Sequence, residues 1–400
     1  MQSRTETELF DRVRTLTPVA TILEEAADLG GGGVYLVGGM LRDLILGRRF
    51  LDVDLAVDGD ALKLACAIGV PEGTESRFGT LRVARDGVRY DLARTRAERY
   101  SHPGALPEVE PARIDDDLTR RDFTVNALAL GLTGPQAGEL IAVDNAHEDL
   151  AARRLVVLHD RSFEDDPTRL LRLARYSARL GFDVSPHTRA LADQAIRNAA
   201  LDTISGTRIG NELRLLASEP DPVAAFEMVA ALGLRWAIAG KLARAALAAV
   251  PPDGRRDLVT LACVFTLQHR PKAQLATELD RLGFTAPDRD AIVEAVTEAP
   301  ALAKRLANTT SAAEIARAVG TSGIETVALA SAQGSPSQSL TWLQDLRHLR
   351  LKITGDDIKA NGIPEGPRIG LALQAANDAL MDGVAPDRDA QLRVALKAAG

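Results

Sequence analysis

The spacing of hydrophobic residues in the first third of the chain alternates between a helical and a strand-like period. Apolar residues three or four positions apart predict a helix over residues 5–29, which ends at the four glycines 30–33. The uninterrupted apolar run 34–37 predicts a buried strand, and two glycines separate it from a short helix over 40–46. Further strands are predicted at 52–57, 80–84 and 88–93, the last two joined by a turn. This part is therefore predicted to be α+β.

Beyond Asp122 strand-like patterns are rare, and most of the chain has a helical period. Two short apolar runs, 141–143 and 155–158, are the exceptions, and loops rich in proline and glycine interrupt the helical pattern. A chain of 400 residues is long enough for two to four domains at the usual size of ~100–200 residues each. We therefore predict an α+β N-terminal part followed by an all-α remainder.

The composition is that of a folded globular protein. Hydrophobic residues make up 46% and charged residues 26% of the chain, which excludes a disordered or collagen-like protein. The two cysteines, Cys66 and Cys263, form no metal-binding cluster, and neither a secretory signal nor an apolar run of membrane-spanning length is recognisable. We expect a soluble protein in the reducing cytoplasm.

The net charge argues against a general attraction to nucleic acid. The chain has 48 Lys and Arg against 55 Asp and Glu, which gives a net charge of −7. Because the mean field of such a protein repels phosphate, any contact with nucleic acid must depend on local basic patches.

A glycine pair and two aspartates form the first pattern that carries chemistry. Gly38 and Gly39 stand between a predicted strand and a predicted helix, where free N–H groups can bind phosphate, and Arg42 follows one turn later. Asp52 and Asp54 are two positions apart in a strand, so their carboxylates share a face and attract a hard cation such as magnesium. Taken separately, these features also fit an ordinary glycine turn and a solvated strand end.

A run of arginines with helical spacing forms the second pattern. Arg169, Arg172, Arg175 and Arg179 fall on one side of a predicted helix, with no acidic residue between them. Asp166, three positions before Arg169, adds a hydrogen-bond acceptor, so this pair can address the edge of a nucleobase. The alternative is an amphipathic surface helix, whereas the functional interpretation is a site for triphosphate or RNA phosphate.

Several segments occur in the order found in one enzyme family. Residues 37–43 with 52–54 resemble the nucleotidyltransferase signature of class II CCA-adding enzymes and bacterial poly(A) polymerases. The other matching segments, which resemble further motifs of that family, are 77–80, 120–127, 165–169, 204–216 and 362–370. Two departures are visible, since Asp165 stands where the family usually has Glu and 144–150 lacks the usual paired glycines.

The resemblance implies a fold and a division into domains. We expect a nucleotidyltransferase head of the DNA polymerase β type, with a small mixed sheet, followed by an all-α neck, body and tail. The expected boundaries are residues 1–150 for the catalytic head, 151–220 for a neck that reads the nucleobase, and 221–400 for a body and tail that bind tRNA.

The resemblance also assigns roles to individual residues. It implies that Asp52 and Asp54 hold Mg²⁺, and Asp91 is a candidate third carboxylate that completes the metal site or activates the attacking hydroxyl. The residues expected to bind the nucleotide are Gly38, Gly39, Arg42 and Arg121 at the phosphates, Asp122 and Asn126 at the ribose, Asp166 and Arg169 at the base, and Arg172 and Arg175 at phosphate.

These expectations combine into a hypothesis of function. The chain is predicted to be a template-independent enzyme that adds C, C and A from CTP and ATP to the 3′ end of tRNA, with release of pyrophosphate. Segment 95–118 resembles the family's flexible loop, and its full length argues against an enzyme that adds only the two cytidines. A poly(A) polymerase or an A-only adder remains possible within the family. A protein that binds RNA without catalysis is the alternative from a different class.

Overall fold

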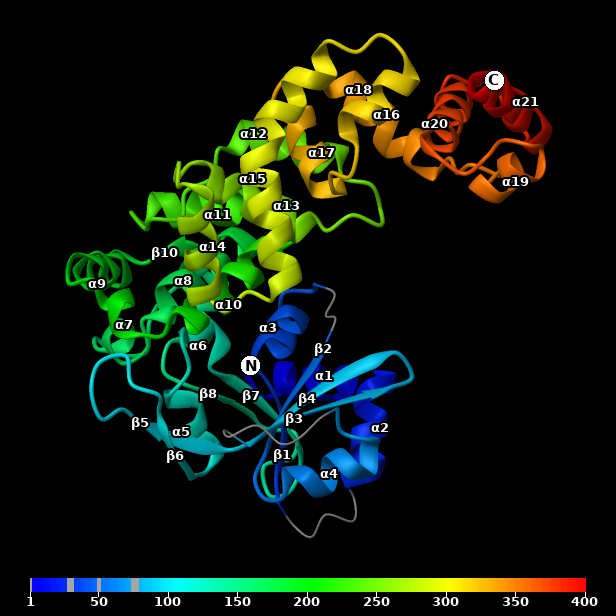
Figure 1. The fold of residues 1–400 in the computed structure, drawn as a ribbon. Helices are drawn as coiled ribbons and strands as arrows, with labels where there is room; N and C mark the ends of the chain where they lie inside the picture. The colour runs from blue at the N-terminus through cyan, green and yellow to red at the C-terminus, as the bar shows by residue number, and fades with distance from the viewer. Residues whose placement is uncertain (1, 27–31, 49–51, 73–78) are drawn as a thin grey trace. The chain divides into compact units, whose positions relative to one another are not determined.

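The structure, a computed structural model, describes residues 2–26, 32–48, 52–72 and 79–400 (Figure 1). It divides into two compact units, Met1–Ile204 and Ser205–Gly400, and each is described here by itself. The predicted three-part division with boundaries at 150 and 220 stays a prediction. In the described part of the chain, no helix is long and apolar enough to cross a membrane.

The first unit is built around one mixed six-stranded sheet. Its strand order is β3-β4-β2-β1-β7-β8, in which β2 and β4 are parallel and the other neighbours antiparallel. The strands are β1 Val34–Val37, β2 Asp52–Val57, β3 Thr80–Arg85, β4 Val88–Arg94, β7 Leu128–Thr133 and β8 Leu140–Ala142. The predicted small mixed sheet is therefore confirmed.

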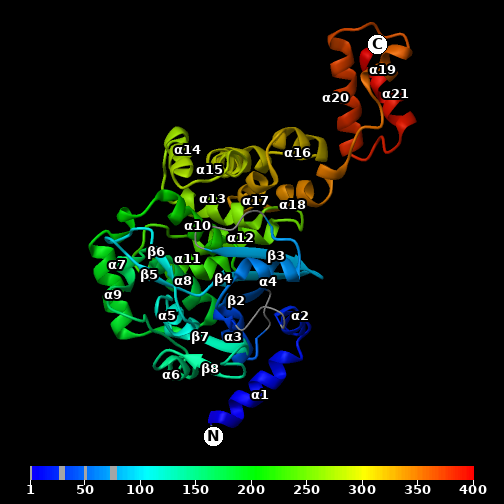
Figure 2. The ribbon, with the colours of Figure 1, turned by 90° about the horizontal axis from the view of Figure 1, so that it is seen from below.

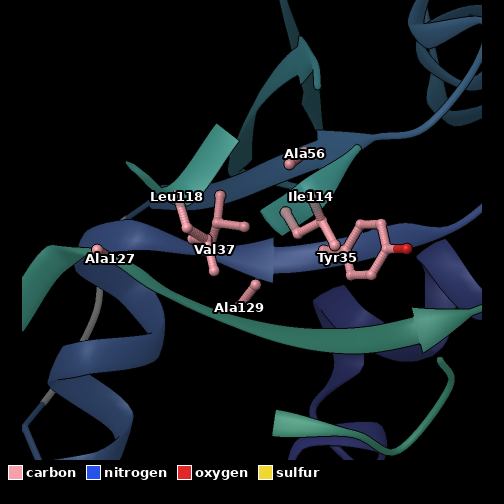
Figure 3. Packing of buried hydrophobic residues seen from close by; sticks show 7 residues of the cluster. All are labelled: Tyr35, Val37, Ala56, Ile114, Leu118, Ala127 and Ala129. Atoms are coloured by element: carbon pink, nitrogen blue, oxygen red, sulfur yellow. The ribbon is translucent and has the colours of Figure 1, made fainter. Parts of the chain in front are cut away.

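Helices cover both faces of this sheet. On one face, Tyr35 and Val37 of β1 pack with the strand alanines against Ile114 and Leu118 of α5 (Ile114–Thr119) (Figure 3). On the other lie α2 (Thr17–Ala26) and α4 (Ala61–Ile68), and the Tyr90 hydroxyl donates to the Pro18 carbonyl of α2 at 3.4 Å. Because side chains alternate along a strand, Asp52 and Asp54 share the face of Ala56, which α5 covers.

The predicted helix over 5–29 is wrong as a single element. The chain forms α1 (Gln2–Arg14) and α2 (Thr17–Ala26), with a break at residues 15 and 16. Pro18 near the start of α2 explains the break, because proline lacks an N–H and its ring clashes with the preceding turn, whereas the first turn of a helix tolerates it. The helix was predicted to end at the glycines 30–33, of which residues 30 and 31 lie outside the described residues.

The structure also contains strands that the apolar pattern did not indicate. β7 is buried next to β1 except for Thr133 at its end, although its leucines and alanine favour helix, so its position in the sheet overrides local propensity. A separate hairpin, β5 (Arg96–Arg99) with β6 (Glu108–Pro111), lies inside the predicted loop 95–118. The predicted strand 155–158 is shorter, since only β9 (Arg154–Leu155) forms, paired with β10 (Asp183–Val184).

The remaining helices of the first unit position the candidate site residues. The segments that follow β1 and β9 supply the glycine pair and the arginine run. These helices are α3 Gly38–Ile45, η1 Thr124–Asn126, α6 Ala146–Ala151, α7 Ser162–Asp165, α8 Thr168–Leu180, α9 Pro186–Arg197 and η2 Ala200–Thr203.

Within its described residues, all of the second unit's regular structure is helical, as predicted. Its elements are α10 Gly206–Ala217, α11 Pro222–Ala231, α12 Gly240–Ala249, α13 Arg256–Thr266, α14 Lys272–Arg281, α15 Ala286–Ala307, α16 Ala312–Val319, α17 Ile324–Ala332, α18 Pro336–Gln344, η3 Leu346–His348, α19 Gly355–Ala360, α20 Pro367–Met381 and α21 Arg388–Ala399. The last three helices lie together (Figure 2), and they share a small core that includes Ile358, Ala372 and Ala395.

A glycine contact in the second unit gives a stability prediction. A Cβ on Gly210 of α10 would lie 1.9 Å from the Leu282 carbonyl oxygen, so Gly210→Ala must push the helix away from that backbone. We expect this variant to lose about 1–3 kcal/mol of unfolding free energy in urea denaturation. Gly370→Ala in α20 is the matched control, because nothing lies within 4 Å of its added methyl and alanine favours helix. Equal stability of the two variants would contradict the packing argument.

Candidate functional site

Three carboxylates gather on one face of the sheet where β2 and β4 run side by side. The parallel register places Asp54 directly opposite Asp91, with Asp52 two positions earlier on the same face. Asp91 Oδ1 accepts a hydrogen bond from Arg82 Nε at 2.8 Å, and Asp52 pairs with Arg89. Both arginines are about half exposed, so water or a ligand can compete for these carboxylates.

The folded protein destabilises the ionised carboxylate of Asp54, and a bound cation would stabilise it. Burial, together with the charges of Asp91 and Asp52, raises the pKa of its carboxyl to about 6 against the opposing effect of Arg121 and Arg42. The negative charge at this point is therefore not balanced by the surrounding arginines.

The donor set fits a hard divalent cation. In the described residues, no three acidic, histidine or cysteine side chains converge closely enough to hold a metal ion by themselves. Two carboxylates suffice for a cation such as Mg²⁺, which usually keeps several waters and takes further ligands from substrate phosphates. Asp52 and Asp54 are the residues that would hold it.

The glycine pair brings the backbone at the start of α3 close to Asp54. Gly38 has φ of +65°, a left-handed conformation that favours glycine, and it begins α3 without a side-chain cap. A Cβ at Gly38 would lie 3.2 Å from Arg121 Nη1 and 3.6 Å from Asp54 Oδ2, and one at Gly39 would lie 3.6 Å from Arg42 Nη2. Two guanidinium groups and one carboxylate thus surround the start of α3, where free N–H groups favour an anion.

Arg121 lies next to Gly38 at the start of α3, where it can bind an anion. Its Nη2 donates to Asp117 Oδ2 of α5 at 2.8 Å, and Nη1 makes a long 3.5 Å contact with the Asn126 carbonyl. Its buried Nε has no partner in the structure. The side chain is therefore held at one end while part of its hydrogen-bonding capacity remains unused, as a phosphate ligand requires.

The structure brings Arg42, Asn126 and Asp122 together in a buried hydrogen-bond network rather than in an open pocket. Arg42 is 1% exposed and donates to Asp43 at 2.9 Å and to Asn126 Oδ1 at 2.5 Å. Asn126 Nδ2 donates to Asp122 Oδ1 at 2.9 Å, and Asp122 Oδ2 accepts two bonds from Arg172 at 2.6 and 2.8 Å. This hydrogen-bond network connects α3 to α8. The predicted contacts of Asp122 and Asn126 with a ribose stay predictions.

Asp122 supplies the negative charge in this hydrogen-bond network, in which it accepts hydrogen bonds from Asn126 and Arg172. Burial alone would raise the pKa of its carboxyl, but the charge of Arg172 and the hydrogen bonds from Asn126 and Arg172 lower it to about 2. The carboxylate is therefore charged at any physiological pH and fixes the side chain of Arg172.

Two of the four arginines of α8 face the interior of the unit. Arg169 is 4% and Arg175 7% exposed, unlike residues of an ordinary surface helix, whereas the side chains of Arg172 and Arg179 are 30% and 39% exposed. Arg169 donates to Ser162 Oγ and to the Arg120 carbonyl, each at 2.6 Å. Asp166 Oδ1 accepts bonds from the backbone N and hydroxyl of Thr168. A base edge would have to exchange with these contacts, so the base-reading role of Asp166 and Arg169 stays a prediction.

A cavity of about 180 Å³ lies where Arg169 meets the β5–β6 hairpin. Glu98 and Tyr100 from the hairpin segment line it together with Arg120, Asp165 and Arg169. Glu98 accepts hydrogen bonds from Arg120 at 2.9 Å and from the Tyr100 hydroxyl at 2.8 Å. The segment predicted as a flexible loop is thus attached to Arg120, at the end of α5, through the buried Glu98 carboxylate.

Sequence reasoning missed several residues that organise the site. Asp117 and Glu98 were read only as parts of a loop, and Asp43 only as part of a motif, although each pairs with an arginine. Tyr176, whose ring lies against three arginines, was not considered. The available signal was one aromatic residue inside an otherwise arginine-rich helix face.

Comparisons with known proteins agree with this architecture. Residues 34–156 match the model of the poly A polymerase head domain. The chain is 36% identical to the CC-adding tRNA nucleotidyltransferase of Deinococcus radiodurans over 371 residues, which covers 91% of this chain and 88% of that protein. The chain therefore belongs to the tRNA nucleotidyltransferase family, and the predicted resemblance is confirmed.

Two further comparisons show the range of this family. The A-adding tRNA nucleotidyltransferase of Geobacter sulfurreducens is 31% identical over 396 residues, which cover 92% of this chain and 45% of that protein. The chain spans half or less of the length of the A-adding relatives it matches. The Thermotoga maritima CCA-adding enzyme complexed with tRNA_CCA superposes with a TM-score of 0.72 at 26% identity, covering 98% of each chain. The predicted nucleotidyltransferase head followed by a helical body is thereby confirmed.

Proposed function

We propose that this protein adds C, C and A to the 3′ end of tRNA, using CTP and ATP and releasing pyrophosphate. The observation that carries the proposal is the pair of carboxylates Asp54 and Asp91. Asp54 lies close to Gly38, at the start of α3, and Gly38 in turn lies close to Arg121. This arrangement supplies two requirements of nucleotidyl transfer, a cation site and an anion site in contact with each other. The structure of the Thermotoga maritima CCA-adding enzyme complexed with tRNA_CCA supports tRNA as the partner.

The residues divide the chemistry between them. Magnesium held by Asp52 and Asp54 would lower the pKa of the RNA 3′-hydroxyl and neutralise charge on the α-phosphate. The 3′-oxygen forms a bond to the α-phosphorus while the bond to the β-phosphate oxygen breaks, and pyrophosphate leaves in line. Asp91, once released from Arg82, accepts the hydroxyl proton or completes the cation site. Arg121 and the open start of α3 bind the phosphates.

Base selection is assigned to the start of α8. Asp166 offers an acceptor and Arg169 a donor, so the pair can address a base edge in place of a template. Arg172 and Arg175 supply positive charge on the same face of the helix for the triphosphate. We propose the cytoplasm as the location, in keeping with a tRNA-processing role.

A second candidate, addition of A alone, has its own support. Three relatives that are 31–38% identical to parts of this chain are A-adding enzymes. The β5–β6 hairpin is fully formed, which argues against addition of the two cytidines only. A poly(A) polymerase stays within the same chemistry and is distinguished by the length of the product.

The decisive experiment uses three tRNA substrates, ending at the discriminator base, after C and after CC. With CTP, ATP and magnesium, the proposal predicts three, two and one added nucleotides, measured on a sequencing gel. Extension of the third substrate alone would overturn the proposal in favour of A addition, and a long adenosine tail would indicate a poly(A) polymerase. Tight tRNA binding without any magnesium-dependent extension would show an RNA-binding protein.

A further inference from the structure

One aromatic ring in the first unit lies against three arginines that come from two separate helices. The Tyr176 centroid is 4.8 Å from the guanidinium carbon of Arg175 and 5.6 Å from that of Arg172, both on α8. Arg42 of α3 approaches the same ring at 5.5 Å. The π face of an aromatic ring is negative, so each contact is attractive.

The ring itself is held in a fixed orientation. Phe123, which directly follows Asp122, meets Tyr176 edge to face, with centroids 6.0 Å apart and an angle of 81° between the rings. Phe123 is fully buried, so the Tyr176 ring cannot move toward it. Tyr176 is therefore a rigid surface against which flexible arginine side chains rest.

Arginine needs such a support if it is to bind phosphate at a defined place. Its side chain loses much rotational freedom when a ligand fixes it, and pre-arrangement before binding removes part of that loss. Asp122 and Asp43 orient Arg172 and Arg42 by ion pairs, and the ring of Tyr176 contacts both of these arginines and Arg175. The ring therefore joins the arginine of α3 to those of α8.

We propose that Tyr176 is a positioning residue for the triphosphate group. By stacking on Arg42, Arg172 and Arg175, its ring holds together a largely buried cluster of positive charge, and Arg172, whose side chain is 30% exposed, receives the phosphates of any nucleoside triphosphate, irrespective of the base. The inference rests on the proposed function for its biological meaning, but it makes a claim about polyphosphate binding that can be measured without RNA.

The ring, and not the hydroxyl, carries this role. Arg172 Nη2 donates to the Tyr176 hydroxyl at 3.4 Å, a long and weak hydrogen bond, whereas the three stacking contacts involve the ring alone. Tyr176→Phe keeps all three contacts and Tyr176→Leu removes them. The two substitutions therefore separate positioning from a role of the hydroxyl.

The test is equilibrium binding of inorganic tripolyphosphate, CTP and ATP to the full chain in the presence of magnesium. For Tyr176→Leu we expect the dissociation constants of all three ligands to rise about tenfold, by a common factor, because cation–π contacts are lost. Tyr176→Phe should stay within about twofold of the wild type. Phe226→Leu, which removes a fully buried ring from α11 in the other unit, is the control for lost packing and should leave all three constants unchanged.

Three results would overturn the proposal. They are unchanged tripolyphosphate binding in a folded Tyr176→Leu variant, a shift in the CTP-to-ATP ratio without loss of tripolyphosphate affinity, and no tripolyphosphate binding by the wild type. If Tyr176→Leu fails to fold, a Tyr176→Phe variant that loses affinity as strongly as Arg175→Ala would contradict the role of the ring. If the wild type does not extend tRNA but binds tripolyphosphate, and Tyr176→Leu binds it about tenfold more weakly, the proposed function is refuted and this inference is supported.

Discussion

Asp54→Asn is expected to abolish nucleotide incorporation and, at the same time, to stabilise the metal-free protein at neutral pH. The loss of activity follows if Asp54 holds the catalytic cation as proposed, and we expect at least about a thousandfold decrease in kcat. Incorporation of labelled CTP into tRNA measures it. A decrease of less than tenfold would exclude Asp54 as a ligand of the catalytic cation.

The gain in stability follows from the sign of the pKa shift. The folded protein raises the pKa of Asp54 from 3.8 to about 6, so between these values the folded state holds a proton that the unfolded state has released. Stability therefore decreases as pH rises through this window and stays reduced above it. The neutral amide removes this penalty, and thermal unfolding at pH 5 and pH 7 should show the larger gain for Asp54→Asn at pH 7.

Asp86→Asn is the matched control for both measurements. Asp86 lies in the exposed turn between β3 and β4, and its side chain is 89% exposed, so the same chemical change there should alter neither activity nor stability appreciably. Magnesium should raise the unfolding temperature of the wild type and of Asp86→Asn but not that of Asp54→Asn, because a ligand stabilises only a folded state that binds it.

Asp122→Ala is expected to destabilise the first unit more than any other single truncation in the site. The substitution leaves Arg172 without its two short hydrogen bonds and Asn126 without an acceptor, in a buried environment. Breaking a buried ion pair from one side costs about 3–5 kcal/mol, and urea unfolding should show a decrease of that size. The double variant Asp122→Ala with Arg172→Met should recover part of it, since it removes the unpaired charge.

The same ion pair has a defined pH dependence. Because the pKa of Asp122 is lowered to about 2, the stability it contributes is fully present above its ordinary value near 3.8 and is lost as pH falls toward 2. The wild type should therefore lose stability in this acid range, and Asp122→Ala should lose less over the same interval. An identical acid dependence of the two proteins would contradict the assignment.

The sequence predicted the order of elements around the site better than the contacts of its side chains. Strand β2 and the turn after β3 were found because alternation and glycine carry a local signal. Strand β7 was missed because its Leu-Ala-rich segment becomes a strand only through pairing with β1. The single helix over 5–29 was wrong because apolar spacing continues across Pro18, whose effect on the backbone the spacing does not register.

For the site, spacing correctly grouped the carboxylates and the arginines, but it could not show what each side chain contacts. Asp54 and Asp91 are adjacent because two strands are parallel, and such pairing has no local pattern. Arg169 and Arg175 were expected to be available to a ligand, and their burial depends on what the rest of the unit places over α8. Tyr176 has no signature of its own, because its role comes from Arg42 on a distant segment.

The parallel pairing of β2 and β4 also constrains when the site can form. A parallel neighbour cannot be reached by a tight turn, so α4 and β3 must be made and β4 must return before Asp91 meets Asp54. The arginines of α8 follow later still in the chain. A growing polypeptide that ends before Asp91 therefore lacks the carboxylate pair, and binding of nucleotide and cation reports on completed folding of the first unit rather than on its early strands.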